Sequence, residues 1–169
     1  MSTMAEFEQE MDAMRARVVG ADYSAALAEV HTAYVDGINR AFADQVGPDG
    51  SAWAPRRDAN PAPLLNVTGR LRAAATGGEG HVKRITANSL VVGVAKGIGS
   101  LAGAFVHQFG AVIRPVRAKM LSWIGHGGQR RFAKQVTIPA RPYVGMDSET
   151  RERCTEIIGQ AFGEKILGR

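Results

Sequence analysis

The side chains best suited to catalysis or metal binding in this 169-residue sequence are four histidines and one cysteine. No histidine has a second His or a Cys at the spacing of a zinc site. The cysteine, Cys154, falls in a segment predicted to be helical and outside any nucleophile motif. We therefore predict no catalytic residue, no metal site and no cofactor, so an enzyme hypothesis would rest on the histidines alone. These are His31, His81, His107 and His126.

A glycine-rich stretch at 97–103, Gly-Ile-Gly-Ser-Leu-Ala-Gly, is similar to a dinucleotide-binding loop. It has three residues where the fingerprint has two, and no strand–helix–strand unit surrounds it. The Gly-Lys-Ser/Thr ending of a phosphate-binding loop is also missing from the sequence here. The stretch therefore predicts a loop and no nucleotide site.

The strongest binding signal is a one-sided run of positive charge. From Ala111 to Arg141 the chain has seven Arg or Lys and no Asp or Glu. In a hairpin, alternation would place part of these cations on one face. A sequence-independent nucleic-acid-binding module that uses residues 111–141 is therefore one hypothesis, and contact with an acidic protein surface is another. The candidate contact residues are Arg114, Arg117, Lys119, Arg130, Arg131, Lys134 and Arg141.

Charge is also divided along the chain, whose formal net charge is +5. Residues 1–50 carry three basic and nine acidic side chains, a net −6, and residues 51–169 carry eighteen and seven, a net +11. This asymmetry fits nucleic-acid contact, an acidic end of one copy that meets the basic face of the next, or two separately solvated surfaces. The second alternative predicts a head-to-tail interface that closes into a ring.

The composition is that of an ordinary globular domain, with 45% apolar and 22% charged residues. We expect one domain over residues 1–169. A lone cysteine excludes an intrachain disulfide, which suits a reducing compartment. No apolar run approaches the ~18 residues of a membrane span, and the acidic start is unlike a signal peptide. We therefore expect synthesis in the cytoplasm and no membrane contact.

Helical patterns dominate the first 46 residues. A first helix, capped by Ser2 or Thr3, is expected to end near Val18. A second is expected from Ser24 to about Gln45, because its apolar residues recur every three or four positions. Residues 47–80 follow as a turn, a proline-rich surface strap anchored by Trp53, and a short helix. Thr68 is the expected cap of that short helix, and the apolar stripe of the second helix is Leu27, Val30, Tyr34, Ile38 and Phe42.

Residues 81–145 predict an antiparallel sheet of two hairpins. The first pairs residues 82–86 with 90–95, and a short helix over 102–109 follows and ends at Gly110. The second hairpin is a long arm, 112–138, whose glycine tip at 125–129 we expect to project and to be mobile. Residues 146–169 predict a helix that is capped by Ser148 and packs on the sheet through Ile157, Ile158, Phe162 and Ile166. The predicted class is α+β.

Four short motifs occur in order: Pro48-Asp49-Gly50-x-x-Trp53, Leu65-x-x-Thr68-Gly69-x-Leu71, His107-Gln108-Phe109-Gly110 and Ile138-Pro139-Ala140-Arg141-Pro142-Tyr143-Val144-Gly145. Together they resemble the phage virion morphogenesis family, the tail-completion or neck proteins of Mu-like and related tailed phages and prophages. The resemblance covers about residues 38–165. Residues 1–37 have no counterpart in it, and Tyr143 stands where the pattern leads us to expect Phe.

The resemblance implies a structural protein of the virion neck that joins head and tail, forms a ring and has no catalytic activity. We expect a hexameric ring in contact with tail-tube or tail-terminator proteins and with the head–tail connector. DNA in the channel lumen is a further candidate partner. In this setting Tyr143 could anchor an interface and Arg141 could bind a carboxylate. The alternative for both residues is an internal corner packed on the last helix.

Overall fold

A computed structural model of the chain describes residues 4–57, 62–95 and 102–168. The described residues contain five helices and six short strands, so the α+β class is confirmed. The helices are α1 (Met4–Val19), α2 (Ser24–Asp44), α3 (Arg70–Thr76), α4 (Ala102–Phe109) and α5 (Ser148–Leu167). The strands are β1 (His81–Ile85), β2 (Leu90–Val94), β3 (Ala111–Ile113), β4 (Leu121–Ile124), β5 (Arg130–Ala133) and β6 (Val136–Ile138). Within these residues, no helix is both long and apolar enough to span a membrane.

The strands form three separate antiparallel pairs in the described part of the chain, where one sheet of two hairpins was predicted. The pair β1–β2 is the first predicted hairpin, with His81 opposite Val94. The second is interrupted: β3 pairs with β6 near the body, and β4 pairs with β5 beyond it. Pro115 lies in the interruption, and proline cannot donate to a strand ladder. The arm therefore consists of two short ribbons in series.

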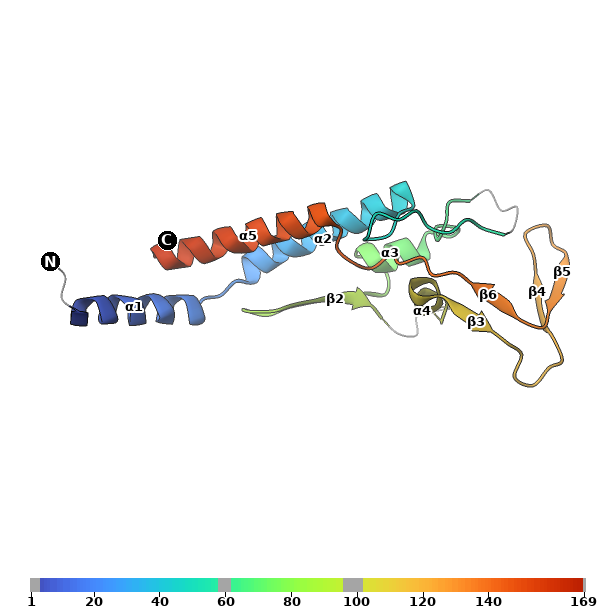
Figure 1. Cartoon of the computed structure of the whole chain (residues 1–169), viewed down its shortest axis with the longest axis horizontal. Helices are drawn as coiled ribbons and strands as arrows, with labels where there is room; N and C mark the ends of the chain where they lie inside the picture. The colour runs from blue at the N-terminus through green and yellow to red at the C-terminus, as the bar shows by residue number, and fades with distance from the viewer. Residues whose placement is uncertain (1–3, 58–61, 96–101, 169) are drawn as a thin grey trace.

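The molecule is elongated (Figure 1). Helix α1 and the C-terminal end of α5 lie at one end, and the β4–β5 ribbon lies at the other. Helices α2 and α5 run side by side over much of the length, with α3 and α4 closer to the strands. The acidic N-terminal helix and the tip of the basic segment are thus at opposite extremes of one subunit.

Close contact between α2 and α5 is permitted by a glycine. A Cβ at Gly37 would collide with Thr150 Oγ1, so the two backbones can approach only because position 37 lacks a side chain. Beside this contact, Arg40 donates to Thr150 Oγ1 at 3.1 Å and pairs with Glu149 at 3.4 Å and Asp147 at 3.7 Å. The last helix packs mainly along α2, and its Ile157 and Ile158 belong to the same apolar cluster as Leu90 of β2.

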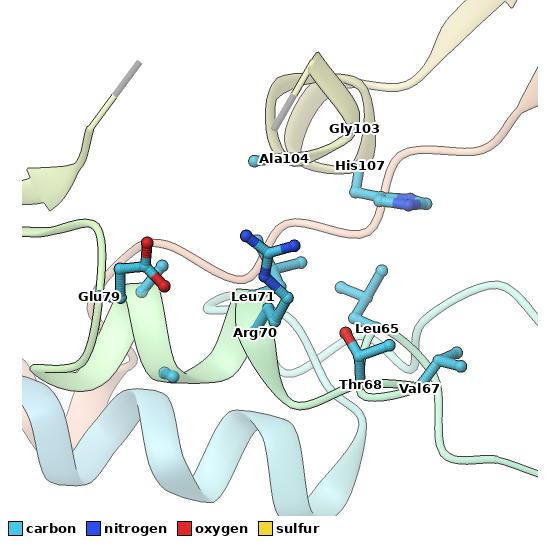
Figure 2. A pocket seen from close by; sticks show the side chains of 11 residues that line it. Leu65, Val67, Thr68, Arg70, Leu71, Glu79, Gly103, Ala104 and His107 are labelled. Atoms are coloured by element: carbon cyan, nitrogen blue, oxygen red, sulfur yellow. The ribbon is translucent and has the colours of Figure 1, made fainter. Parts of the chain in front are cut away.

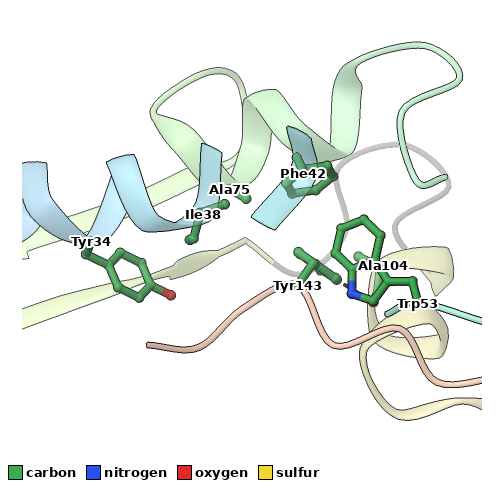
Figure 3. Packing of buried hydrophobic residues seen from close by; sticks show 7 residues of the cluster. All are labelled: Tyr34, Ile38, Phe42, Trp53, Ala75, Ala104 and Tyr143. Atoms are coloured by element: carbon green, nitrogen blue, oxygen red, sulfur yellow. Dashed lines mark hydrogen bonds between the residues drawn. The ribbon is translucent and has the colours of Figure 1, made fainter. Parts of the chain in front are cut away.

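The main core is built from five segments that are separated in sequence (Figure 3). Phe42 of α2 lies between Trp53 and Tyr143, with ring centroids 5.4 and 5.9 Å apart. The predicted stripe of α2 is confirmed, except that Leu27 is only half-buried. The buried cluster comprises Tyr34, Ile38, Phe42, Trp53, Ala75, Ala104 and Tyr143.

Two predicted helix caps are shifted by one residue. The cap of α5 is Asp147, whose carboxylate accepts from Thr150 N at 2.6 Å, where Ser148 was predicted. The cap of α3 is Gly69 with φ of 73°, where Thr68 was predicted. Asp147 is favoured because its charge serves both the helix N-terminus and nearby Arg40. The predicted Ser2 or Thr3 cap of α1 lies outside the described residues.

Candidate functional site

The sequence motifs meet around one core, against which Leu65 and Leu71 of the second motif pack. We call the other three motifs, residues 48–53, 107–110 and 138–145, the motif cluster. Gln108 of α4 joins two of them. Its amide oxygen accepts from Tyr143 N and Val144 N, both at 3.0 Å, and its amide nitrogen donates to Val144 O at 3.0 Å. The side chain thereby satisfies main-chain groups that would otherwise be unpaired between a helix and an extended segment. Sequence reasoning did not single out Gln108.

Arg141 is buried in the motif cluster, with 7% of its surface exposed. Its main-chain N donates to His107 O at 2.6 Å. Its guanidinium donates from Nε to Ala54 O at 2.7 Å and from Nη2 to Pro55 O at 3.0 Å. Of the two alternatives for this residue, the structure places Arg141 in an internal corner, where it holds the strap against the body.

Tyr143 and Trp53 complete the same corner. Tyr143 is 3% exposed, and its hydroxyl donates to Ala104 O at 3.4 Å. Burial raises the pKa of Tyr143, and nearby Tyr34 raises it further. Trp53 Nε1 donates to Pro142 O at 2.8 Å, so the predicted anchor of the strap is buried and hydrogen-bonded. Both aromatic rings therefore act within the subunit.

Two glycines of the motifs are required by close backbone approach. Gly110 has φ of 73°, and a Cβ there would lie 2.9 Å from Ala140 N. A Cβ at Gly145 would collide with the ring of Pro48. The glycines that end the 107–110 and 138–145 motifs thus keep the three segments in contact.

His107 lies at the edge of the cluster and is half-buried. Burial lowers the pKa of His107, and the charges of Arg141 and Arg56 lower it further. Its Nδ1 is buried and has no hydrogen-bond partner among the described residues.

Two other histidines form a pair. His31 Nε2 and His81 Nε2 are 2.9 Å apart, and His81 Nδ1 lies 3.3 Å from Ala74 O. A carbonyl can only accept, so neutral His81 carries its proton on Nδ1 and accepts from His31 at Nε2. Burial lowers the pKa of His31, as do Lys83 and His81. No group of three or more His, Cys, Asp or Glu that could hold a metal occurs in the described residues.

A cavity of about 440 Å³ lies between α3 and α4 (Figure 2). Its walls are mostly apolar, and its ionisable side chains are Arg70, Glu79 and His107. Figure 2 shows Arg70 and Glu79 on the α3 side and His107 extending from α4. This set contains neither a nucleophile nor a carboxylate pair, so we assign no chemistry to the cavity. The glycine-rich stretch at 97–103 falls mostly outside the described residues.

A larger cavity of about 670 Å³ opens between the strap and the arm, and we call it the basic groove. Apolar side chains of both walls line it, including Leu65, Trp123 and Ile138. No described residue of its lining is Asp or Glu. Its cations are Arg56, Arg57, Arg131 and Arg141.

The arm presents the other predicted contact residues to solvent. We call residues 111–138 the basic arm; six of its Arg and Lys are exposed, and none forms an ion pair within the described residues. Among these six side chains, Arg114 makes a side-chain hydrogen bond: its Nε donates to Gln135 Oε1 at 3.3 Å. The structure thus divides the predicted set: Arg141 and Tyr143 lie inside the subunit. The six on its surface are Arg114, Arg117, Lys119, Arg130, Arg131 and Lys134.

Comparison with known protein families gives one match. A family model described as the phage virion morphogenesis family matches residues 3–163. The match includes residues 4–37, for which the sequence motifs alone had given no counterpart, so the acidic N-terminal segment is part of the matched region. Comparisons with curated proteins and with solved structures give no match.

Proposed function

The chain belongs to the phage virion morphogenesis family, and we propose that it is a tail-completion or head–tail joining subunit in the neck of a phage or prophage-derived particle. Membership of this family assigns the chain a structural role in phage assembly. The neck position, the ring and the absence of catalysis are parts of the proposal.

The observation that carries the proposal is the set of six exposed cations on the basic arm, without an acidic partner in the described parts of their own subunit. Exposed charges contribute little to folding, typically about 0–1 kcal/mol even when paired. Their counter-charges are then on another molecule: a neighbouring subunit, the tail tube, the connector or DNA in the channel. The arm is the part of the subunit that makes these contacts.

The two-ended charge distribution supports ring formation. An acidic end and a basic end on one subunit favour a head-to-tail contact between copies, which closes into a ring when the rotation per copy permits. We propose a hexamer. Light scattering at low and at high salt tests this, because such contacts weaken as salt screens them. A chain that stays monomeric at high concentration, and in lysates that contain tails, argues against the ring.

The joining role is tested by complementation. Lysates of a phage that lacks this protein should contain separate heads and tails, and adding the purified chain should restore joined particles in electron micrographs. Hydrolase, transferase and nucleotide-binding assays should be blank. Reproducible turnover that is abolished by His107→Ala would overturn the structural role.

The second candidate is a nucleic-acid-binding module, favoured by the same exposed cations. It predicts that the isolated chain shifts DNA of any sequence in a gel, with an affinity that falls steeply with salt. It also predicts no requirement for the chain in head–tail joining. The two assays together separate the candidates.

A further inference from the structure

Helix α1 carries an apolar stripe that its own subunit does not cover. None of its residues is buried, and Met4, Phe7 and Met11 are 74%, 55% and 44% exposed. These residues recur every three or four positions and so share one face of a helix about 24 Å long. An isolated helix of this length is marginal in water, and such a face normally packs against a partner. The stripe continues toward α5 as Met4, Phe7, Met11, Met14 and Val18.

Acidic residues border the stripe. At 100° per residue, Glu8 and Asp12 fall on one side of it and Glu10 on the other. The C-terminal part of α1 contacts its own subunit, where Arg17 Nη2 donates to Ile166 O of α5 at 3.3 Å. The first three turns of α1 thus offer an apolar seam between two acidic margins.

The basic groove has the complementary character. Trp123 in its wall is 40% exposed, although it is large and apolar. In the β4–β5 register Trp123 lies opposite Arg131, and both line the groove, so a cation stands beside the apolar surface. Its described lining has cations on both walls and no carboxylate. An apolar helix face with acidic margins fits such a groove in the way amphipathic helices bind apolar grooves elsewhere.

Within one subunit the two surfaces cannot meet, because α1 and the β4–β5 ribbon lie at opposite ends of the molecule (Figure 1). We propose that the N-terminal helix α1 of one copy docks in the basic groove of the next copy, with its stripe on Trp123 and its carboxylates against the groove cations. The contact is heterologous, so each copy gives one surface and receives the other. This inference deepens the proposed ring by naming the interface on which it rests.

Two full-length variants test the docking. Variant A, Phe7→Ser with Met11→Ser, removes the stripe and keeps the groove. Variant B, Trp123→Ser with Arg131→Ser, removes the groove wall and keeps the stripe. Each alone should self-associate about 100-fold more weakly than the wild type in sedimentation velocity, as expected when central apolar anchors are lost. Mixed in equal amounts, they should form a one-to-one heterodimer that grows no further, since B supplies the helix and A supplies the groove.

Matched controls use neighbouring residues on other faces. Val19→Ser changes an exposed apolar residue of α1 outside the stripe. Phe132→Ser changes an exposed aromatic residue on the opposite face of the β4–β5 ribbon. Both controls should self-associate as the wild type does. Because all substituted side chains are exposed, circular dichroism and the melting temperature should match the wild type in every variant.

The outcomes separate the docking from the proposed function. If variants A and B oligomerise normally, the docking is wrong and the ring uses another surface. If B alone still self-associates while A does not, copies pair through α1 itself, which also overturns the docking. If the wild type is monomeric and A and B do not associate when mixed, the docking and the ring fail together, while the complementation assay still decides the joining role.

Discussion

The motif cluster and the basic arm contain the same residue types in opposite settings. Trp53 in the cluster is 5% exposed and Trp123 in the arm is 40% exposed. The Gln108 side chain makes three hydrogen bonds at 3.0 Å to main-chain groups, whereas that of Gln135 accepts one from Arg114 at 3.3 Å. The cluster holds the fold together, and the arm is left to interact outward.

This difference indicates that the motifs by which the chain resembles its family serve folding within the subunit. Tyr143, Gly110 and Gly145 act inside the subunit, where they bring three segments into contact. A surface for assembly requires exposure and uncompensated charge, and the arm has both. Substitutions in the two regions should therefore separate stability from assembly.

The largest contrast is expected between the two tryptophans. Trp53→Ala should lower the free energy of unfolding by about 3–5 kcal/mol, because it empties the aromatic core and removes the hydrogen bond to Pro142. Trp123→Ala should change it by less than about 1 kcal/mol, because the ring is largely exposed. Urea denaturation followed by circular dichroism measures both. Equal losses would abolish the distinction between the two regions.

A smaller contrast is expected between the two glutamines. Gln108→Leu keeps the volume but leaves main-chain groups of Tyr143 and Val144 unpaired, which should cost about 1–3 kcal/mol. Gln135→Leu removes one exposed contact and should stay within about 0.5 kcal/mol of the wild type. The midpoints of urea denaturation of the two variants measure this difference in stability. A Gln108→Leu variant as stable as Gln135→Leu would show that the three hydrogen bonds do not hold the cluster.

The folded body should also lose stability in mild acid. His31 and His107 have lowered pKa values in the folded chain, so they are neutral there and bind protons more readily once unfolded. The stability that these two histidines contribute is complete above the pKa of an unfolded histidine, about 6.5. It decreases as the pH falls toward their lowered pKa values in the folded chain. The urea midpoint should thus be lower at pH 5.5 than at pH 7.5. His31→Gln with His107→Gln should reduce that decrease; a wild type equally stable at both pH values would contradict the prediction.

The smallest effect on stability is expected from Arg130→Ala, Arg131→Ala and Lys134→Ala combined. Exposed and unpaired in the described structure, these side chains should leave the melting temperature nearly unchanged. The same variant should be deficient in assembly or head–tail joining. If it unfolds, and its remaining folded fraction joins tails normally, the arm is a structural element.

Local patterns in the sequence were sufficient to predict much of the helical framework. The spacing of Tyr34, Ile38 and Phe42 placed the buried face of α2, and Gly110 marked the end of α4. Caps were less accurate, because neighbouring Asp147 and Ser148 are both good capping residues and only the contact with Arg40 distinguishes them.

The roles of Gln108 and Arg141 could not be obtained from local sequence. Gln108 acts on residues up to 36 positions away, and Arg141 donates to carbonyls 86 and 87 positions away. A polar side chain in a motif looks the same whether its partner is a main chain of its own subunit or another protein.

The distance in sequence between Trp53 and Pro142, 89 residues, also has a consequence for synthesis of the chain. A nascent chain that has not reached residue 142 contains α2 with its aromatic face uncovered, and contacts over such separations form slowly. The basic groove, which includes Arg141 in its lining, is likewise incomplete until then. Folding and the ability to associate are therefore completed together, near the end of translation, and truncated chains should be excluded from assembly.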